Sequence, residues 1–261
     1  MAFPLPVAPQ DALLTAGPQA GHILDLWRLT VFTCTGVFTV ILLAFLYAVW
    51  RAPRSHRNTP ADVRSLARPE TGLTRKVIWA TAVCTALLLG LIVASVFTDR
   101  ALACLKLQDA LHIEVTAHQW WWELRYSDAE ASRMFTTANE LHVPVGRPVI
   151  LSLKSDDVIH SLWVPGLAGK KDLIPGRTAT LTLRADRAGT YRGQCAEFCG
   201  AQHAWMAFLV TADPPDRFEA WAAGQRQSAP PPTRAELARG QALFMAGTCA
   251  MCHTITGTNA N

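Results

Sequence analysis

The sequence predicts a membrane-anchored all-β protein, in which a two-helix transmembrane hairpin is followed by a β-sandwich and then by the start of a small α-helical domain. Three observations carry this prediction. The chain has 261 residues, of which half are hydrophobic and only 17% are charged, a composition that is unusual for a purely soluble protein. Two long apolar runs lie within the first hundred residues. Short β-rich runs, broken by glycine and proline, follow them.

The two apolar runs are Leu29 to Trp50 and Val77 to Phe97, and neither contains a charged side chain. Each is about 20 residues long, which is enough to cross roughly 30 Å of hydrocarbon as a helix. A pair of buried core helices is the alternative, but a core helix of this length normally shows a polar stripe. We therefore predict transmembrane helices at residues 27–50 and 77–98.

The loop at residues 51–76 sets the expected orientation of this hairpin. It carries seven basic residues against two acidic ones, whereas the whole chain has a net charge of only +4. The positive-inside rule places such a loop in the cytoplasm, and residues 1–26 and everything after the second helix outside it. Because the rest of the chain is close to neutral, a basic surface for nucleic acid is not expected.

Residues 99–223 are predicted to form the extracytoplasmic domain. From about residue 107 to 212 the chain consists of short runs rich in Val, Ile, Thr and aromatic residues, separated by turns such as Pro175-Gly176. This spacing predicts an antiparallel sandwich or barrel of about 100 residues. A helix-like stretch surrounds Trp221, a proline-rich linker occupies residues 224–233, and a last small domain begins at 234 and runs to 261.

The most specific string is Cys195-Ala-Glu-Phe-Cys199-Gly-Ala-Gln-His203-Ala-Trp-Met206, and His160 lies upstream of it. Thiolate, imidazole and thioether ligands together favour copper over magnesium or calcium. His160, Cys199, His203 and Met206 alone would suit a mononuclear blue-copper site, but Cys195 adds a second thiolate that can bridge two ions. A disulfide, or a structural zinc site with the two histidines, is the alternative.

These motifs resemble subunit II of cytochrome c oxidases over residues 25–212, which implies a cupredoxin-like β-sandwich. In that family the CxExCGxxHxxM loop and the DVIHSxWVP strand hold the dinuclear copper centre called CuA. The resemblance implies that five side chains and one backbone carbonyl, that of Glu197, bind copper. The five side chains are those of His160, Cys195, Cys199, His203 and Met206. It also implies that the Glu197 carboxylate helps to bind magnesium at the interface with subunit I.

An aromatic string, His118-Gln119-Trp120-Trp121-Trp122, precedes these ligands. Alternate residues of a strand face opposite ways, so core packing is expected for at least one indole. The family motif HQWxW is similar, and it implies that electrons enter at Trp120. His112, His118 and His142 are interpreted as structural or exposed. The resemblance departs at Lys76, where the family often has a glutamate linked to proton uptake.

Near the end of the chain, Cys249-Ala-Met-Cys252-His253 is typical of covalent haem c attachment, in which His253 is an axial ligand. The preceding stretch predicts an amphipathic helix similar to the first helix of cytochromes c. A thiol redox site is the alternative, but it would need a thioredoxin-like sheet. Only eight residues follow His253, and they contain no second axial ligand. We therefore expect the three haem residues to be vestigial or disordered in this chain, though functional in the intact protein.

Together these features predict subunit II of a cytochrome c oxidase, a multi-pass protein of the bacterial inner membrane with its copper domain on the periplasmic side. Electrons from cytochrome c, or from the fused haem c, would pass through copper to haem in subunit I, where oxygen is reduced to water. Expected partners are the other oxidase subunits and the lipid bilayer. A copper-bearing subunit of a nitric oxide reductase and a non-enzymatic copper carrier are the alternatives. A quinol oxidase subunit would lack the copper ligands.

Overall fold

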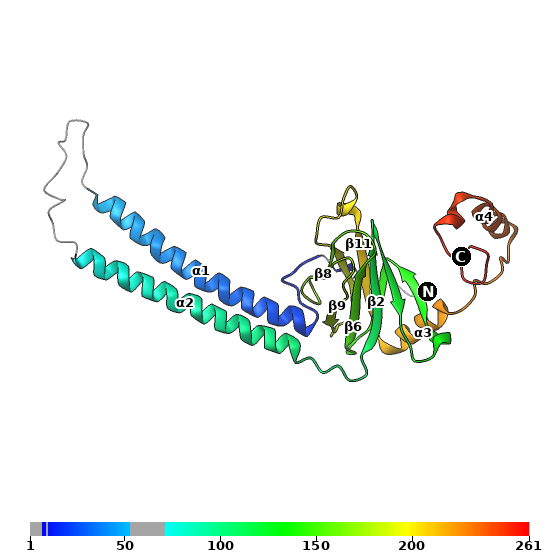
Figure 1. The fold of residues 1–261 in the computed structure, drawn as a ribbon, viewed down its shortest axis with the longest axis horizontal. Helices are drawn as coiled ribbons and strands as arrows, with labels where there is room; N and C mark the ends of the chain where they lie inside the picture. The colour runs from blue at the N-terminus through cyan, green and yellow to red at the C-terminus, as the bar shows by residue number, and fades with distance from the viewer. Residues whose placement is uncertain (1–6, 9, 53–70, 261) are drawn as a thin grey trace, which may run out of the picture. The chain divides into compact units, whose positions relative to one another are not determined.

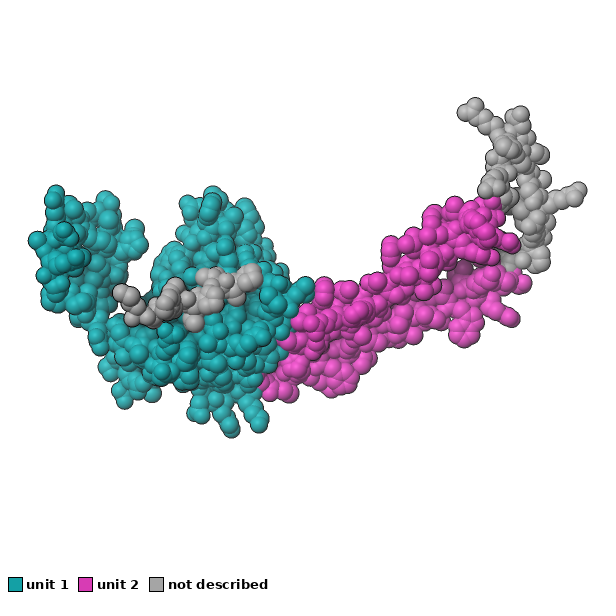
Figure 2. All heavy atoms as spheres, turned by 180° about the vertical axis from the view of Figure 1, so that it is seen from behind, with its two compact units in different colours: residues 1–20, 106–261 teal, residues 21–105 magenta. Residues whose placement is uncertain are grey.

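The computed structural model describes residues 7–8, 10–52 and 71–260 (Figure 1). Most of the predicted cytoplasmic loop, residues 53–70, therefore lies outside the described residues. The chain divides into two compact units, which Figure 2 colours separately. One unit comprises residues 1–20 and 106–261, and the other comprises residues 21–105.

The second unit is the predicted helical hairpin. Helix α1 spans Pro18–Arg51 and helix α2 spans Thr71–Ala103, and both are long and apolar enough to cross a membrane. The hydroxyls of Thr30, Thr33 and Thr39 donate to the carbonyl oxygens four residues earlier. These bonds satisfy polar groups within the helix itself, which suits an environment without water.

The first unit is built on a β-sandwich of two sheets (Figure 1). The path of the first sheet is β5 (Glu140–Pro144), β11 (Ala207–Asp213), β10 (Gly189–Cys195), β7 (His160–Trp163) and β8 (Lys171–Leu173), and β1 (Val7–Ala8) pairs with β10. The second sheet is ordered β4 (Phe135–Ala138), β3 (Trp121–Tyr126), β2 (Leu111–His118), β6 (Val149–Ser155) and β9 (Ala179–Leu183). The predicted hairpin and sandwich are thus confirmed.

The expectation of purely antiparallel sheets is wrong. Strands β2 and β6 pair in parallel, as do β5 and β11. The chain leaves the second sheet after β4, adds β5 to the first sheet and returns as β6, so β6 reaches β2 running in the same direction. The alternation of apolar and polar residues has a period of two in either direction, so it carries no information about this choice.

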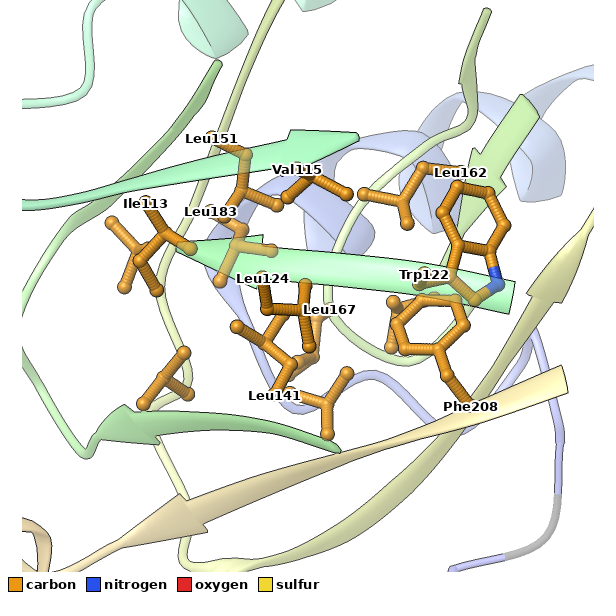
Figure 3. Packing of buried hydrophobic residues seen from close by; sticks show 14 of the residues in the cluster. Ile113, Val115, Trp122, Leu124, Leu141, Leu151, Leu162, Leu167, Leu183 and Phe208 are labelled. Atoms are coloured by element: carbon orange, nitrogen blue, oxygen red, sulfur yellow. The ribbon is translucent and has the colours of Figure 1, made fainter. Parts of the chain in front are cut away.

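The core lies between the two sheets and is filled by side chains from strands of both (Figure 3). In β6, the side chains of Val149, Leu151 and Leu153 are fully buried, while the residues between them are partly exposed. Burial of each such side chain contributes roughly 1.5–3 kcal/mol. At one end of the core the rings of Trp122 and Phe208 pack with centroids 5.3 Å apart.

A short stretch before α1 also belongs to the sandwich unit, which the sequence did not indicate. The backbone N–H of Ala16 donates to the carbonyl of Gly166 at 2.7 Å, and that of Asp186 donates to the carbonyl of Ala16 at 2.8 Å. A Cβ atom on Gly17 would lie 2.3 Å from the carbonyl oxygen of Arg184. Only glycine fits at this close approach of two backbones.

Helix α3 (Pro215–Gln225) follows the last strand and packs on the sandwich. Its Trp221 ring stacks on His142, with centroids 4.0 Å apart, and His142 Nδ1 lies 2.7 Å from a carboxylate oxygen of Asp213. The structural interpretation of His142 is thereby confirmed. Helix α4 spans Ala235–Ala246, and short 3-10 turns occupy Ala131–Arg133 (η2), His203–Trp205 (η3) and Thr248–Met251 (η4).

Candidate metal centre

The copper-ligand string forms the connection between two adjacent strands of the first sheet. Cys195 is the last residue of β10 and Met206 directly precedes β11, so the sheet fixes both ends of the loop. The backbone N–H of Cys195 donates to the carbonyl of Met206 at 3.0 Å, and that of Ala196 donates to the carbonyl of Ser161 at 2.9 Å. The second bond ties the loop to β7.

Strand β7 brings the distant histidine to this loop. His160 is its first residue, and β7 pairs antiparallel with the end of β10, where Cys195 lies opposite Leu162. His160 Nδ1 therefore lies 3.8 Å from Cys195 Sγ. The ligand atoms of His160, Cys195 and Cys199 all lie within 4.8 Å of one another, and all three residues are buried.

The remaining predicted copper residues converge on the same point. His203 Nδ1 lies 3.6 Å and Met206 Sδ 3.7 Å from the sulfur of Cys199. The carbonyl oxygen of Glu197 lies 3.1 Å from the sulfur of Cys195, while the Glu197 side chain is exposed. Two thiols, two imidazoles, a thioether and a carbonyl thus surround one small region, a donor set suited to a soft, redox-active metal.

The electrostatics of the two thiols fit a bound cation. Burial raises the pKa of Cys195, but hydrogen bonds with His160 and neighbouring backbone groups outweigh it, and the net shift is downward. Burial and the charge of nearby Cys195 both raise the pKa of Cys199. Two thiolates this close repel each other, so the protein alone favours one thiolate and one thiol. Positive charge between the sulfurs would stabilise both thiolates.

Asp157 supports the site in a way that its motif did not reveal. One of its carboxylate oxygens lies 2.7 Å from His160 Nε2, the ring nitrogen that points away from the sulfurs, and the other accepts from the backbone N–H of Gln119 at 2.6 Å. Burial raises the pKa of Asp157, yet these hydrogen bonds and His160 lower it overall. Burial lowers the pKa of His160, while Cys195 and Asp157 raise it. In the sequence, the position of Asp157 three residues before His160 was the available signal for this supporting role.

The aromatic string lies against the copper loop through its second and third residues. Trp120 Nε1 donates to the carbonyl of Cys199 at 3.2 Å, and Gln119 Nε2 donates to the same oxygen at 2.7 Å. Gly200 has a φ of +116°, and a Cβ there would lie 3.3 Å from the Trp120 ring. Trp120 is partly exposed, so its indole joins the protein surface to a ligand residue.

The neighbouring tryptophans take other positions. Trp122 is fully buried, with its ring centroid 6.1 Å from that of His160. Trp121 is on the outer face and stacks on His118, with centroids 4.5 Å apart. His118 also lies between the carboxylates of Glu123 and Asp156, at 3.6 and 3.8 Å. His118 therefore has partners of its own outside the copper cluster.

The three residues predicted to attach haem lie outside this cluster, in and directly after η4. Cys249, Cys252 and His253 are exposed, and the backbone N–H of His253 donates to the carbonyl of Cys249 at 2.9 Å. This hydrogen bond closes a turn, and the expectation that the three residues are vestigial or disordered stays a prediction. The predicted helix before them is present as α4, and the Phe244 and His253 rings lie 6.4 Å apart.

Comparisons with known proteins agree with this geometry. The family model described as cytochrome c oxidase subunit II, periplasmic domain, matches residues 111–213. Cytochrome c oxidase subunit 2 of Alkalihalophilus pseudofirmus is 32% identical over 252 residues, which cover 95% of this chain and 71% of that protein. The same subunit of Bacillus sp. strain PS3 is 33% identical over 195 residues, covering 69% of this chain and 53% of that protein.

Among solved structures, the periplasmic domain of subunit II of the Bradyrhizobium japonicum cytochrome oxidase is similar, with 28% identity and a TM-score of 0.43. That similarity covers 46% of this chain and 97% of the other. The 32% identical relative aligns with almost the whole chain, and the matched domain contains all six residues that converge at the metal centre. This chain therefore belongs to the cytochrome c oxidase subunit II family.

Proposed function

We propose that this chain is the electron-transfer subunit of a cytochrome c oxidase. It receives electrons from cytochrome c, or from its own haem c, at a dinuclear copper centre, and it passes them to haem in subunit I, where oxygen is reduced to water. The observation that carries this proposal is the convergence of two thiols, two imidazoles, a thioether and a carbonyl within one loop and the strand beside it.

Six residues would hold the copper. Cys195 and Cys199 supply thiolates, His160 and His203 supply imidazoles, Met206 supplies its thioether, and Glu197 supplies its carbonyl oxygen. When bound, such a thiolate-linked copper pair supplies a carrier that accepts and releases one electron at a time. The chain itself contributes no acid or base to oxygen reduction.

Burial and rigidity are what the protein adds to this centre. The exposed fractions of His160, Cys195, Cys199 and Met206 are between 0 and 3%, so these four ligands have little contact with water, whereas His203 is partly exposed. The sheet holds the loop at both ends, and Asp157 orients the His160 ring. A fixed ligand set of this kind changes little between oxidation states, which suits fast electron transfer and disfavours the exchange of metal that a copper carrier requires.

Trp120 is proposed as the point where electrons enter. Its ring is partly exposed, while its N–H donates to the carbonyl of Cys199, a proposed ligand. A donor that docks over this indole would be separated from a ligand residue by a single hydrogen bond. The buried Trp122, although it lies beside His160, offers no such surface.

The exposed carboxylate of Glu197 is proposed to bind magnesium together with subunit I. Its backbone carbonyl faces Cys195, so one residue would link the copper site with the subunit interface. Cys249 and Cys252 are proposed to attach haem c, with His253 as an axial ligand, because their exposed side chains leave room for a porphyrin.

We place the protein in the bacterial inner membrane as a multi-pass subunit, with the copper domain at residues 99–223 on the periplasmic side. The two apolar helices and the match to a periplasmic domain support this placement. The proposed spans are 27–50 and 77–98, and the proposed haem domain starts at residue 234.

Metal analysis with electron paramagnetic resonance of the purified full chain tests the central proposal. We expect two coppers for each chain and one unpaired electron shared equally between them. A single copper with a localised electron would indicate a mononuclear blue site instead. Stoichiometric zinc with no bound copper would contradict an electron-transfer role altogether. Mutation of Met206 to Leu provides a matched variant, because it removes the thioether and keeps the volume.

A further inference from the structure

A hollow lies at the end of the sandwich opposite the metal centre. Strand β2 starts there at Leu111, whereas its other end, at His118, adjoins the aromatic string. The hollow has a volume of about 360 Å³ and is lined by the start of β2, the end of β3, the start of β4, the turn before β6 and helix α3. Ligand pockets in proteins are typically about 300–1,000 Å³, so this volume suits a small molecule or a headgroup.

Aromatic rings and guanidinium groups both contribute to its lining. Tyr126 and Phe218 are buried, and Phe135 stacks on Tyr126 with ring centroids 4.5 Å apart. Three arginines line the same hollow, each from a different segment of the chain: Arg133, Arg147 and Arg226. Apolar rings beside guanidinium groups raise the strength of an ion contact, because the local dielectric constant is lower than that of water.

Two of these arginines have no carboxylate partner within the described part of the chain. Arg133 is paired with Asp128, at 3.4 Å, whereas the ion pairs found in the described residues involve neither Arg147 nor Arg226. Glu219 is the other acidic residue of the lining. The balance of unpaired charge in the hollow is therefore positive.

Arg147 is already oriented by the protein. Its Nε donates to the carbonyl oxygen of Asp109 at 2.6 Å, which leaves both terminal Nη groups available. A guanidinium held in this way presents a planar pair of donors, which matches the oxygens of a phosphate group better than a single ammonium does. Arg226, at the end of α3, offers a second guanidinium from another wall.

We propose that this hollow binds a phosphate group, held by Arg147 and Arg226 beside the aromatic residues of its lining. The phosphate belongs either to a phospholipid headgroup or to a soluble organic phosphate. Ala110, which lines the hollow, follows Ala103 at the end of α2 by seven positions. Because α2 is a proposed membrane span, the test compares a phospholipid with a soluble phosphate. Because Phe218 and Ala222 of α3 also line the hollow, a bound phosphate would hold that helix in place.

The test uses the full-length chain in a non-ionic detergent and three probes, which are inorganic phosphate, dihexanoyl phosphatidic acid and, as a zwitterionic control, dihexanoyl phosphatidylcholine. Calorimetric titration gives the dissociation constants. We expect the Arg147→Gln and Arg226→Gln variants to bind at least about tenfold more weakly, the usual effect of losing one charged hydrogen-bond donor. Arg192→Gln, an exposed site on β10 outside the hollow, should bind as the parent does.

Arg147→Lys separates charge from geometry, because it keeps the positive charge and loses the planar fork; we expect it to recover part of the affinity. Binding of inorganic phosphate that depends on both arginines assigns the site to soluble phosphates. Binding of phosphatidic acid alone assigns it to lipid. If the parent chain binds none of the anionic probes, the proposal is overturned without any variant. If both glutamine variants fold and bind as well as the parent, the proposal is overturned as well.

Discussion

Replacing Asp157 by Asn is the sharpest test of how the fold supports the metal centre. The carboxylate of Asp157 lies 2.7 Å from His160 Nε2 and also accepts the backbone N–H of Gln119 at 2.6 Å. Asparagine keeps the shape and one acceptor oxygen, but it loses the charge. A hydrogen bond to a charged group contributes roughly 1.5–3 kcal/mol, about twice a neutral one. The substitution should therefore cost about 1–1.5 kcal/mol of ligand support.

This loss has two measurable consequences. Partners of metal-bound histidines typically change metal affinity by about 10–100-fold when removed, and we expect about tenfold for Asp157→Asn because one hydrogen bond remains. The carboxylate also makes the imidazole of His160 a more strongly electron-donating ligand, and it so stabilises the more oxidised state of the copper centre. Its loss should raise the reduction potential by tens of millivolts, since 59 mV corresponds to about 1.4 kcal/mol for one electron.

Competition with a copper chelator and spectroelectrochemistry measure these two quantities. Asp156→Asn is the matched control, because its carboxylate is exposed and lies 3.8 Å from His118, away from the copper ligands. A copper affinity within twofold of the parent and an unchanged potential in Asp157→Asn would refute the reasoning. In the metal-free protein the pKa of Asp157 is lowered, so its stabilising effect is present above its unfolded-state pKa and is lost as the pH falls through its folded-state pKa.

Three further predictions follow from the same contacts. Trp120→Phe removes the N–H that donates to the carbonyl of Cys199, so electron transfer from a soluble donor should slow by at least about tenfold, while the copper spectrum stays unchanged. Stopped-flow kinetics measures this rate, and a rate equal to that of the parent would contradict the role of the indole. Gly200→Ala places a Cβ on a residue with a φ of +116°, 3.0 Å from Gln119 Nε2, so urea unfolding should show that the free energy of unfolding falls by about 1–3 kcal/mol. The control Gly224→Ala, where a Cβ would meet nothing within 4 Å, should show no such loss. Because the pKa of Cys199 is raised, copper binding must displace the thiol proton, and the apparent copper affinity should increase about tenfold per pH unit below that pKa. Proton release measured during a copper titration tests this. A pH-independent copper affinity would argue against a bound Cys199 thiolate.

Much of the metal centre could be predicted because its ligands are close in the sequence. Cys195, Cys199, His203 and Met206 lie within one short stretch of the chain, so a single loop brings these four donors near one another. The helical hairpin was equally predictable, because an uninterrupted apolar run is a local property. The amphipathic pattern before the haem motif correctly predicted α4 for the same reason.

Other features depended on contacts between distant segments. The contact of His160 with Cys195 requires β7 to pair with β10, and the parallel pairing of β2 with β6 requires a crossing between sheets. The bridge from Asp157 to Gln119 and the packing of residues before α1 on the sandwich also had no local signal. The sequence by itself determined which donors and which apolar segments the protein has, because residue type and spacing are local. Only the tertiary structure decided which strand each donor faces, because strand pairing depends on the free energy of the whole core.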